Sequence, residues 1–138
     1  NLAGKVNRSM PHWVVKQLIS RLKKKQNKVL ILGIAYKKDI NDCRESPAFS
    51  IINILKQKKN FSISYSDPYI KKIPKLRDYN FSNMRSVKIN SNELKKYDAV
   101  VLVTDHQKFN YRLIEKNSKL IIDARHKFNK KLDKVVYS

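Results

Sequence analysis

The sequence predicts an α/β domain with a mainly parallel sheet, because three observations agree. Short continuous apolar runs, typical of strands buried on both faces, recur along the chain. Segments with helical apolar spacing separate these runs. The length of 138 residues suits one hydrophobic core and is too short for two comfortable domains. We therefore expect a three-layer, Rossmann-like domain with right-handed crossovers, preceded by a lead-in helix.

The N-terminal segment predicts a helix that stands apart from the sheet. Apolar residues at three- and four-residue spacing predict this helix over 11–24, with Ser9 and Pro11 at its start. Because it precedes the first strand, it is more typical of a connection from another domain than of the layers that cover a sheet. We therefore expect residues 1–26 to lead in from a central domain that this sequence lacks, and residues 27–138 to form the α/β domain.

Two strands flank a well-marked helix in the next part of the chain. The run KVLILGI, residues 28–34, predicts a strand buried on both faces. Ser46 followed by Pro47 is typical of a helix cap and first turn, and the apolar stripe that follows predicts a helix over 47–58. Apolar residues alternating with serine over 61–68 predict a second strand that ends at an Asp-Pro turn.

The second half of the chain continues the alternation of helices and strands. Turn-forming residues over 69–85 predict an irregular connection. The remaining predicted elements are a short capped helix at 91–97, a strand at 98–105, a helix marked by Phe109, Leu113 and Ile114, a strand at 119–125 and an edge strand at 134–137.

Positive charge is the most uneven feature of the composition. The formal net charge is +20, and lysine-rich runs lie mostly where loops and helix ends are expected. A solvated surface is the simpler explanation, and a contiguous basic face for nucleic acid is the alternative. No membrane-spanning run, signal peptide or zinc signature is visible. We therefore expect a cytoplasmic protein with no metal, no membrane partner and no specific nucleic-acid partner.

Ligand chemistry is expected beyond the carboxyl ends of the strands. The three strand ends GIAYKKDINDCRES, TDHQKFNY and DARHK share one rim if their strands are neighbours. The candidate rim residues are Tyr36, Lys37, Lys38, Arg44, His106 and Arg125. Cations beside an aromatic ring suit a planar anionic ligand such as a nucleotide diphosphate. Lys37 would act as a point charge, Arg125 would fork across two oxygens, and Tyr36 would stack or donate its hydroxyl.

Each candidate also has a structural explanation. The alternatives are a solvated position for Lys38, a core cap for Tyr36, an ion pair with Asp39 or Asp42 for Arg44, and an ion pair with Asp123 for Arg125. Cys43 has no histidine nearby in sequence, which favours a packing role or a passive thiol. The glycine-rich dinucleotide fingerprint is absent, so the domain alone should not hold NAD in the usual way.

The ordered motifs resemble a known family. KVLILGIAYKKDINDCRESPAFSIINIL followed by YSDPY is similar to the C-terminal, UDP-binding domain of the UDP-sugar 6-dehydrogenases. AGKVNRSMPHWVV resembles the helical segment that leads into that domain, and VLVTDHQKFNY and IIDARHKF resemble two later strand ends. The resemblance covers nearly the whole chain. AGKVNRSMP, YKKD and TDHQKFNY favour the branch that acts on UDP-N-acetylhexosamines.

The resemblance implies a four-electron oxidation of the sugar C6 hydroxyl to a carboxylate for surface polysaccharide synthesis. In that family, two NAD and one water are consumed, through a thiohemiacetal and a thioester on a cysteine. By the same resemblance, Tyr36, Lys37 and Arg125 would contact the UDP-sugar, and Arg44 would reach NAD bound mainly by an N-terminal domain. The full-length enzyme would be a homodimer or a larger homo-oligomer.

The sequence lacks several parts of that enzyme. The N-terminal dinucleotide domain, the glycine-flanked catalytic cysteine and its assisting lysine and aspartate are not in it, and Cys43 lies in a different motif. We therefore expect weak UDP-sugar binding, no catalytic residue and no activity from this chain alone. Two other hypotheses stay open at this point. They are a basic nucleic-acid-binding module, which would not prefer UDP over ADP, and a free-standing nucleotide-sugar sensor.

Overall fold

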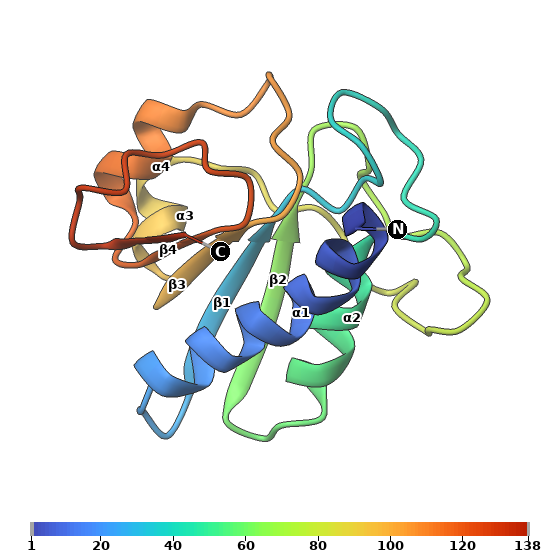
Figure 1. The fold of residues 1–138 in the computed structure, drawn as a ribbon, viewed down its shortest axis with the longest axis horizontal. Coiled ribbons are helices and arrows are strands. Elements are labelled where there is room, and N and C mark those ends of the chain that lie inside the picture. The colour runs from blue at the N-terminus through green and yellow to red at the C-terminus, as the bar shows by residue number, and fades with distance from the viewer. Residues whose placement is uncertain (1, 138) are drawn as a thin grey trace.

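The computed structural model of the protein describes residues 2–137, with side chains from residue 9 onward. Helices and strands alternate along the chain after an N-terminal helix (Figure 1). The elements are α1 (Leu2–Arg21), β1 (Asn27–Leu32), α2 (Pro47–Lys56), β2 (Phe61–Ser66), α3 (Ser91–Lys95), β3 (Ala99–Leu102), α4 (Tyr111–Asn117), β4 (Ile121–Asp123) and β5 (Val135–Tyr137).

The strands form one five-stranded sheet in the order β2-β1-β3-β4-β5. Every pair of neighbours is parallel, including the short edge strand β5. The sequence-based prediction of a mainly parallel sheet is therefore confirmed. The order also places β1, β3 and β4 side by side, which is the condition that the predicted ligand rim required.

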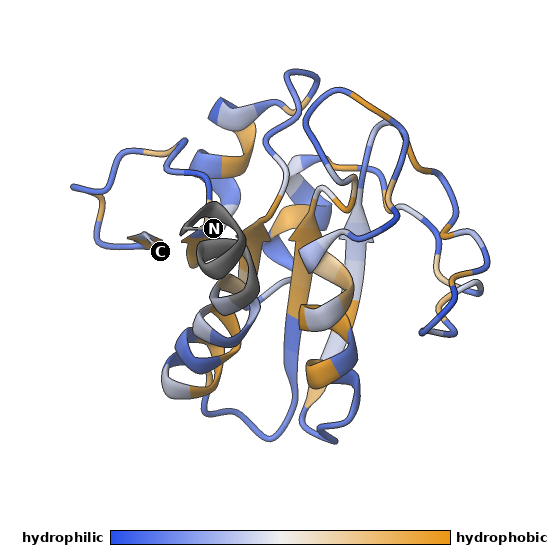
Figure 2. Ribbon diagram, turned by 45° about the vertical axis from the view of Figure 1, so that its right-hand side comes forward, coloured by the Kyte–Doolittle hydropathy of each residue, from blue (hydrophilic) through white to orange (hydrophobic). Residues whose placement is uncertain are grey.

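Helices cover both faces of the sheet and make three layers. Successive residues of β1 point to opposite faces, so Val29 belongs to one hydrophobic core and Leu30 to the other. The first core also contains apolar side chains of α1 and α2, and the second contains those of α3 and α4. Figure 2 shows the apolar strands enclosed between these helices.

Helix α1 packs against the sheet beside α2. This corrects the sequence-based expectation that the helix stands apart from the layers that cover the sheet. Val14 and Leu18 are fully buried in the core shared with α2. The helix also begins earlier than predicted, at Leu2, so Ser9 and Pro11 do not mark its start and Pro11 lies inside it. Within the described residues, no helix is both long and apolar enough to cross a membrane. The origin of this segment in a further domain stays a prediction.

Local capping explains where the shorter helices begin. The Ser46 hydroxyl accepts a hydrogen bond from the backbone N–H of Ala48, and Pro47 occupies the first turn of α2, as the sequence predicts. Helix α4 begins after Phe109, because the Asn110 side chain caps it by accepting from Leu113 N–H. The predicted helix over this segment is confirmed, with a later start.

Gly33 directly follows β1, where the backbone passes close to Thr104, just after the end of β3. Its φ of 84° lies in the left-handed region, which L side chains rarely adopt. A Cβ at this position would lie 2.3 Å from the Thr104 carbonyl oxygen. The Val103 and Thr104 N–H groups both donate to Leu32 O, so the end of β1 and the segment after β3 are held together at this carbonyl. The single glycine of this loop therefore serves packing rather than phosphate binding.

Replacing Gly33 with alanine should destabilise the fold strongly. The added methyl group meets backbone atoms of Thr104, which cannot move aside as a flexible side chain could. We expect Gly33→Ala to lower the free energy of unfolding by at least about 2 kcal/mol in urea denaturation. Ser62→Ala, at the exposed position of β2, is the control and should change it by less than about 0.5 kcal/mol. Equal stabilities of the two variants would contradict this account.

Candidate functional site

The loops that follow β1, β3 and β4 lie along one edge of the sheet, at the top of Figure 1. Three parallel neighbours span about 10 Å from the first strand to the third. Backbone hydrogen bonds join the loops where they leave the sheet, from Val103 N–H to Leu32 O and from Ala124 N–H to Leu102 O. We define the carboxyl-edge rim as the surface formed by Tyr36, Lys37, Lys38, Arg44 and Arg125.

Three of the predicted ligand residues lie exposed on this rim. Tyr36 is 50% exposed, so it does not cap the core, and Lys37 Nζ lies 5.9 Å from the centroid of its ring. Arg125 is half exposed and donates through Nε to Asp105 Oδ1 at 3.2 Å. Its expected ion-pair partner, Asp123, instead accepts from the Arg125 backbone N–H. The aromatic ring and both cations therefore have solvent access.

Arg44 makes the structural ion pair that the sequence left open. Its Nε and Nη2 donate to the two carboxylate oxygens of Asp42, at 3.1 and 2.9 Å. Hydrogen bonding from Arg44 lowers the pKa of Asp42 to about 2. Because the Arg44 side chain is 81% exposed, solvent screens this pair and it contributes little to stability. The guanidinium group therefore remains accessible to another anion.

His106 is absent from the rim surface, contrary to its predicted place there. It is completely buried, and its Nδ1 accepts a hydrogen bond from the Asp39 backbone N–H at 2.7 Å. Since Nδ1 is an acceptor, the proton is on Nε2, which donates to Asp67 Oδ2 at 2.9 Å. His106 thus joins the ends of β2 and β3 to the loop after β1.

Asp67 is the centre of this buried network. Besides His106, its Oδ2 accepts from the Ile34 and Ala35 backbone N–H groups, and its Oδ1 accepts from Tyr69 N–H. Four donors therefore satisfy the hydrogen-bonding capacity of a carboxyl group that is only 2% exposed. We call the set of Asp67, His106 and Asp39 the loop clamp, because it fixes the segment that presents Tyr36 and Lys37.

A second buried carboxylate organises the loop that carries Arg125. Asp123 is fully buried at the end of β4. Its Oδ2 accepts from the backbone N–H groups of Lys127 and Phe128, each at 2.8 Å. With the Arg125 N–H bond to Oδ1, three donors hold this loop in a tight turn. The position of the Arg125 side chain is therefore set by buried backbone contacts.

Neither a reactive thiol nor a metal cluster is part of the described site. Cys43 is buried in the core beneath α2, and this burial raises the pKa of its thiol, so its position is that of a packed side chain. Within residues 2–137, no group of three or more His, Cys, Asp or Glu side chains is arranged to hold a metal ion.

Sequence reasoning missed the buried carboxylates and two further cations of this edge. Lys108 Nζ lies 4.7 Å from the centroid of the Tyr69 ring, and Lys127 Nζ lies 5.0 Å from that of Tyr111. The Asp-Pro turn after β2 was visible in the sequence, but it gave no sign that Asp67 would bond to a different loop. The contact joins residues 39 positions apart, and only the fold reveals it.

This chain belongs to the class of three-layer α/β domains with a parallel sheet. It carries an aromatic and cationic rim at the carboxyl ends of its strands, the edge where ligands bind in such sheets. The sequence profile described as the UDP binding domain of the UDP-glucose/GDP-mannose dehydrogenase family matches residues 30–130. The chain therefore belongs to this family.

Curated relatives and solved structures agree with this assignment. The NDP-N-acetyl-D-galactosaminuronic acid dehydrogenase of Ralstonia solanacearum is 33% identical over 89% of the chain, which spans 28% of that relative. The UDP-N-acetyl-D-mannosamine dehydrogenase of Methanococcus vannielii is 31% identical over 94% of the chain and 30% of its own length. The native structure of the UDP-N-acetyl-mannosamine dehydrogenase of Staphylococcus aureus superposes with a TM-score of 0.66, at 30% identity, over 96% of the chain and 31% of that structure. The chain thus spans under a third of each of these proteins.

Removing the charge of Asp67 should weaken the loop clamp. Asparagine keeps one acceptor oxygen, but its amide nitrogen would then face a backbone donor. We expect Asp67→Asn to lower the free energy of unfolding by about 2 kcal/mol, measured by urea denaturation. The exposed Asp78→Asn is the control, with a change below about 0.5 kcal/mol. A variant at Asp67 as stable as the control would refute the clamp.

Proposed function

We propose that this chain is the nucleotide-sugar-binding portion of an NAD-dependent UDP-N-acetylhexosamine 6-dehydrogenase. The observation that carries the proposal is the convergence of three strand ends at the carboxyl-edge rim, in a chain whose family profile describes a UDP binding domain. The named relatives are described as an NDP-N-acetyl-D-galactosaminuronic acid dehydrogenase and a UDP-N-acetyl-D-mannosamine dehydrogenase. These descriptions support a nucleotide-linked N-acetylhexosamine as the substrate of the enzyme that contains this chain.

The rim residues provide complementary contacts for a uridine diphosphate. Lys37 would neutralise phosphate charge, and Arg125 would exchange its exposed bond to Asp105 for a forked contact to ligand oxygens. Tyr36 would stack on the ligand or donate its hydroxyl. Because the strand ends supply one glycine among them, long side chains would take the place of the close backbone contacts that glycine-rich loops make.

Arg44 is the residue that we assign to NAD. Arg44 would make a single contact to NAD and would not enclose it, because its guanidinium is exposed and, among the described residues, pairs with the partly exposed Asp42. Such a group can exchange a carboxylate for a phosphate of a dinucleotide that is held mainly by another domain. When bound, NAD would accept the hydride removed from the sugar. No residue of this chain is assigned a catalytic role.

The activity of the complete enzyme follows as part of the proposal. It would oxidise the sugar C6 hydroxyl to a carboxylate in the cytoplasm, as a homodimer or a larger homo-oligomer, and its product would serve surface polysaccharide synthesis. The names of the relatives support the reaction class. The region shared with them supports only the nucleotide-sugar contacts, since it is less than a third of their length.

The substrate contacts are tested by isothermal titration of the chain with UDP. We expect Lys37→Ala and Arg125→Ala each to weaken UDP binding by about 1.5 to 3 kcal/mol, roughly ten- to a hundredfold, because each removes a charge-assisted contact. Lys38→Ala is the matched control, since this neighbouring exposed lysine is expected to be solvated. Unchanged affinity in both variants would show that the site is assigned to the wrong residues.

Titration with other ligands separates this function from the alternatives. The chain should prefer UDP over ADP, whereas a nucleic-acid module would bind short duplexes with steep salt dependence and show no such preference. We also expect Arg44→Ala to leave UDP affinity within about twofold of the parent chain, because the nearby guanidinium is assigned to NAD. A large loss of UDP binding in Arg44→Ala would move this residue into the substrate site.

A further inference from the structure

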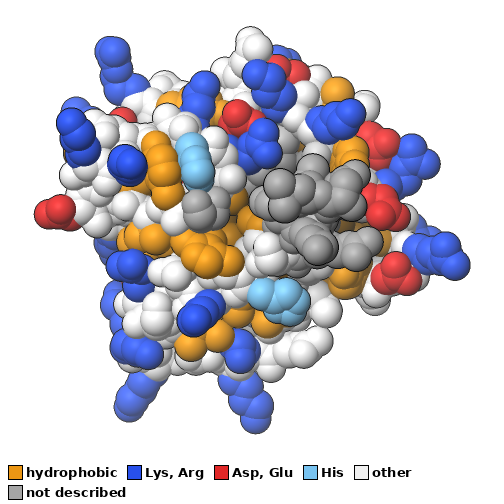
Figure 3. Space-filling view, viewed as in Figure 1, with side chains coloured by type: hydrophobic (Ala, Val, Ile, Leu, Met, Phe, Trp, Pro, Cys, Tyr) orange, Lys and Arg blue, Asp and Glu red, His pale blue; other side chains and the backbone are white. Residues whose placement is uncertain are grey.

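A group of eleven of the 31 cationic residues lies on the edge of the sheet opposite the rim. The segments that enter β1 to β4 meet at this amino edge, because all strands run parallel. They contribute eleven cationic residues, and two acidic residues, Asp98 and Glu93, pair with cations among them. The cations are Arg21, Lys23, Lys24, Lys25, Lys28, Lys56, Lys58, Lys59, Lys95, Lys96 and Lys119. In Figure 3 the lower edge of the molecule carries Lys and Arg side chains without Asp or Glu.

Helix dipoles explain only part of this concentration. The helices run opposite to the strands, so all four end at the amino edge, and each has a basic residue in its last turn. A helix C-terminus carries about half a negative charge, which one cation per helix more than offsets. Two other lysines of this edge are neutralised by ion pairs in the described structure. Lys24 pairs with Asp98, and Lys96 pairs with Glu93. Most of the remaining lysines face solvent.

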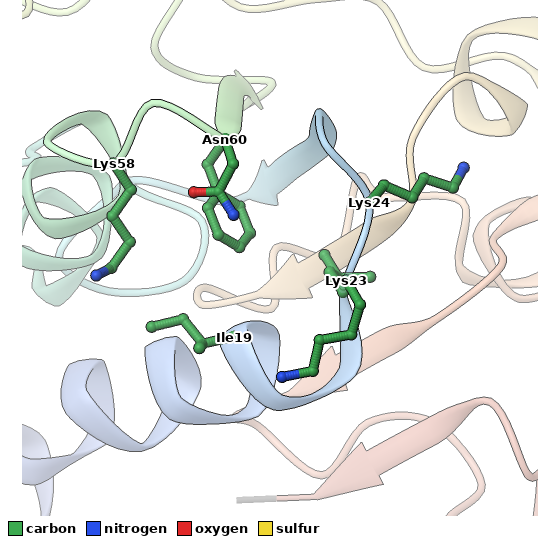
Figure 4. Close-up of a pocket in the computed structure, with 7 residues that line it drawn as sticks. Ile19, Lys23, Lys24, Lys58 and Asn60 are labelled. Carbon is green, nitrogen blue, oxygen red and sulfur yellow. The ribbon is translucent and has the colours of Figure 1, made fainter.

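The amino edge also exposes aliphatic surface between its lysines. Ile19 is 38% exposed and lies in a cleft with Leu22 and Phe61. Figure 4 shows Lys23 and Lys58 on either side of Ile19, whereas Lys24 extends away. An aliphatic side chain flanked by two long cationic side chains can reach the boundary between lipid headgroups and acyl chains while the ammonium groups stay at the headgroups.

The chemistry of this edge fits a lipid surface better than a nucleic acid. Its only arginine is Arg21, so the fork-shaped donors that recognise phosphates and bases are scarce. Its aromatic residues Phe61 and Tyr97 are buried and cannot stack on bases. Lysines on several loops instead provide a broad array of point charges, which a fluid layer of anionic headgroups can match without fixed geometry.

We propose that the amino edge docks this protein on an anionic phospholipid surface. The contact is peripheral, and it differs from the sequence-based expectation of no membrane partner. Docking through this edge leaves the carboxyl-edge rim facing away from the lipid and open to a soluble ligand. The proposal does not depend on the identity of the ligand at the rim.

The test is co-sedimentation of the chain with phospholipid vesicles at physiological ionic strength. The parent chain should bind vesicles of phosphatidylcholine mixed with phosphatidylglycerol and should not bind phosphatidylcholine alone. Replacing Lys23, Lys25, Lys58 and Lys59 with glutamate should weaken this binding by at least about a hundredfold, since each lysine near an anionic membrane contributes appreciably.

A charge-matched variant separates the amino edge from net charge alone. Glutamate at Lys71, Lys72, Lys75 and Lys88 changes the charge equally on the exposed connection between β2 and α3. This control should bind vesicles within about threefold of the parent chain. Equal losses in both fourfold variants would overturn the proposal, as would failure of the parent chain to bind anionic vesicles. Thermal unfolding followed by circular dichroism checks that both variants are folded.

A variant without a charge change distinguishes lipid from nucleic acid. Ile19→Ser removes the exposed aliphatic side chain and should weaken vesicle binding several-fold while leaving binding to a short DNA duplex unchanged. The fourfold amino-edge variant is titrated with the same duplex. Tighter binding of the parent chain to duplex than to vesicles through these lysines would assign the edge to nucleic acid and overturn the proposal.

Discussion

The arrangement of the carboxyl-edge rim depends on one buried carboxylate. Asp67 accepts four hydrogen bonds from three segments, and through His106 it also fixes Asp39 in the loop after β1. A buried charge is tolerated only when donors surround it, so each of these segments constrains the others. Gly33 permits the close approach to Thr104 that the network needs. The backbone that carries Tyr36 and Lys37 is therefore fixed, although their long side chains are exposed.

The parallel topology also gives the two edges of the sheet opposite helix-dipole fields. Every helix begins near the carboxyl edge and ends near the amino edge, so the helix dipoles favour anions at the first and cations at the second. The distribution of charged side chains follows this division. Buried Asp67 and Asp123 lie at the carboxyl edge, whereas the amino edge is almost entirely lysine.

Sequence patterns predicted the elements that local rules determine. Ser46 with Pro47 located the start of α2, and the apolar runs located β1, β3 and β4. The start of α1 was placed too late because Pro11, common in a first helical turn, here lies inside the helix. The burial of His106 and the pairing of Arg125 with Asp105 depend on contacts between distant loops. No local pattern contains that information.

The most direct test of the account is a crystal structure of this chain with UDP. The account predicts the diphosphate at the carboxyl ends of β1, β3 and β4, within hydrogen-bond distance of Lys37 Nζ and the Arg125 guanidinium, with Asp67 and His106 unchanged. A diphosphate bound elsewhere, for example between Lys23 and Lys58 at the amino edge, would contradict it.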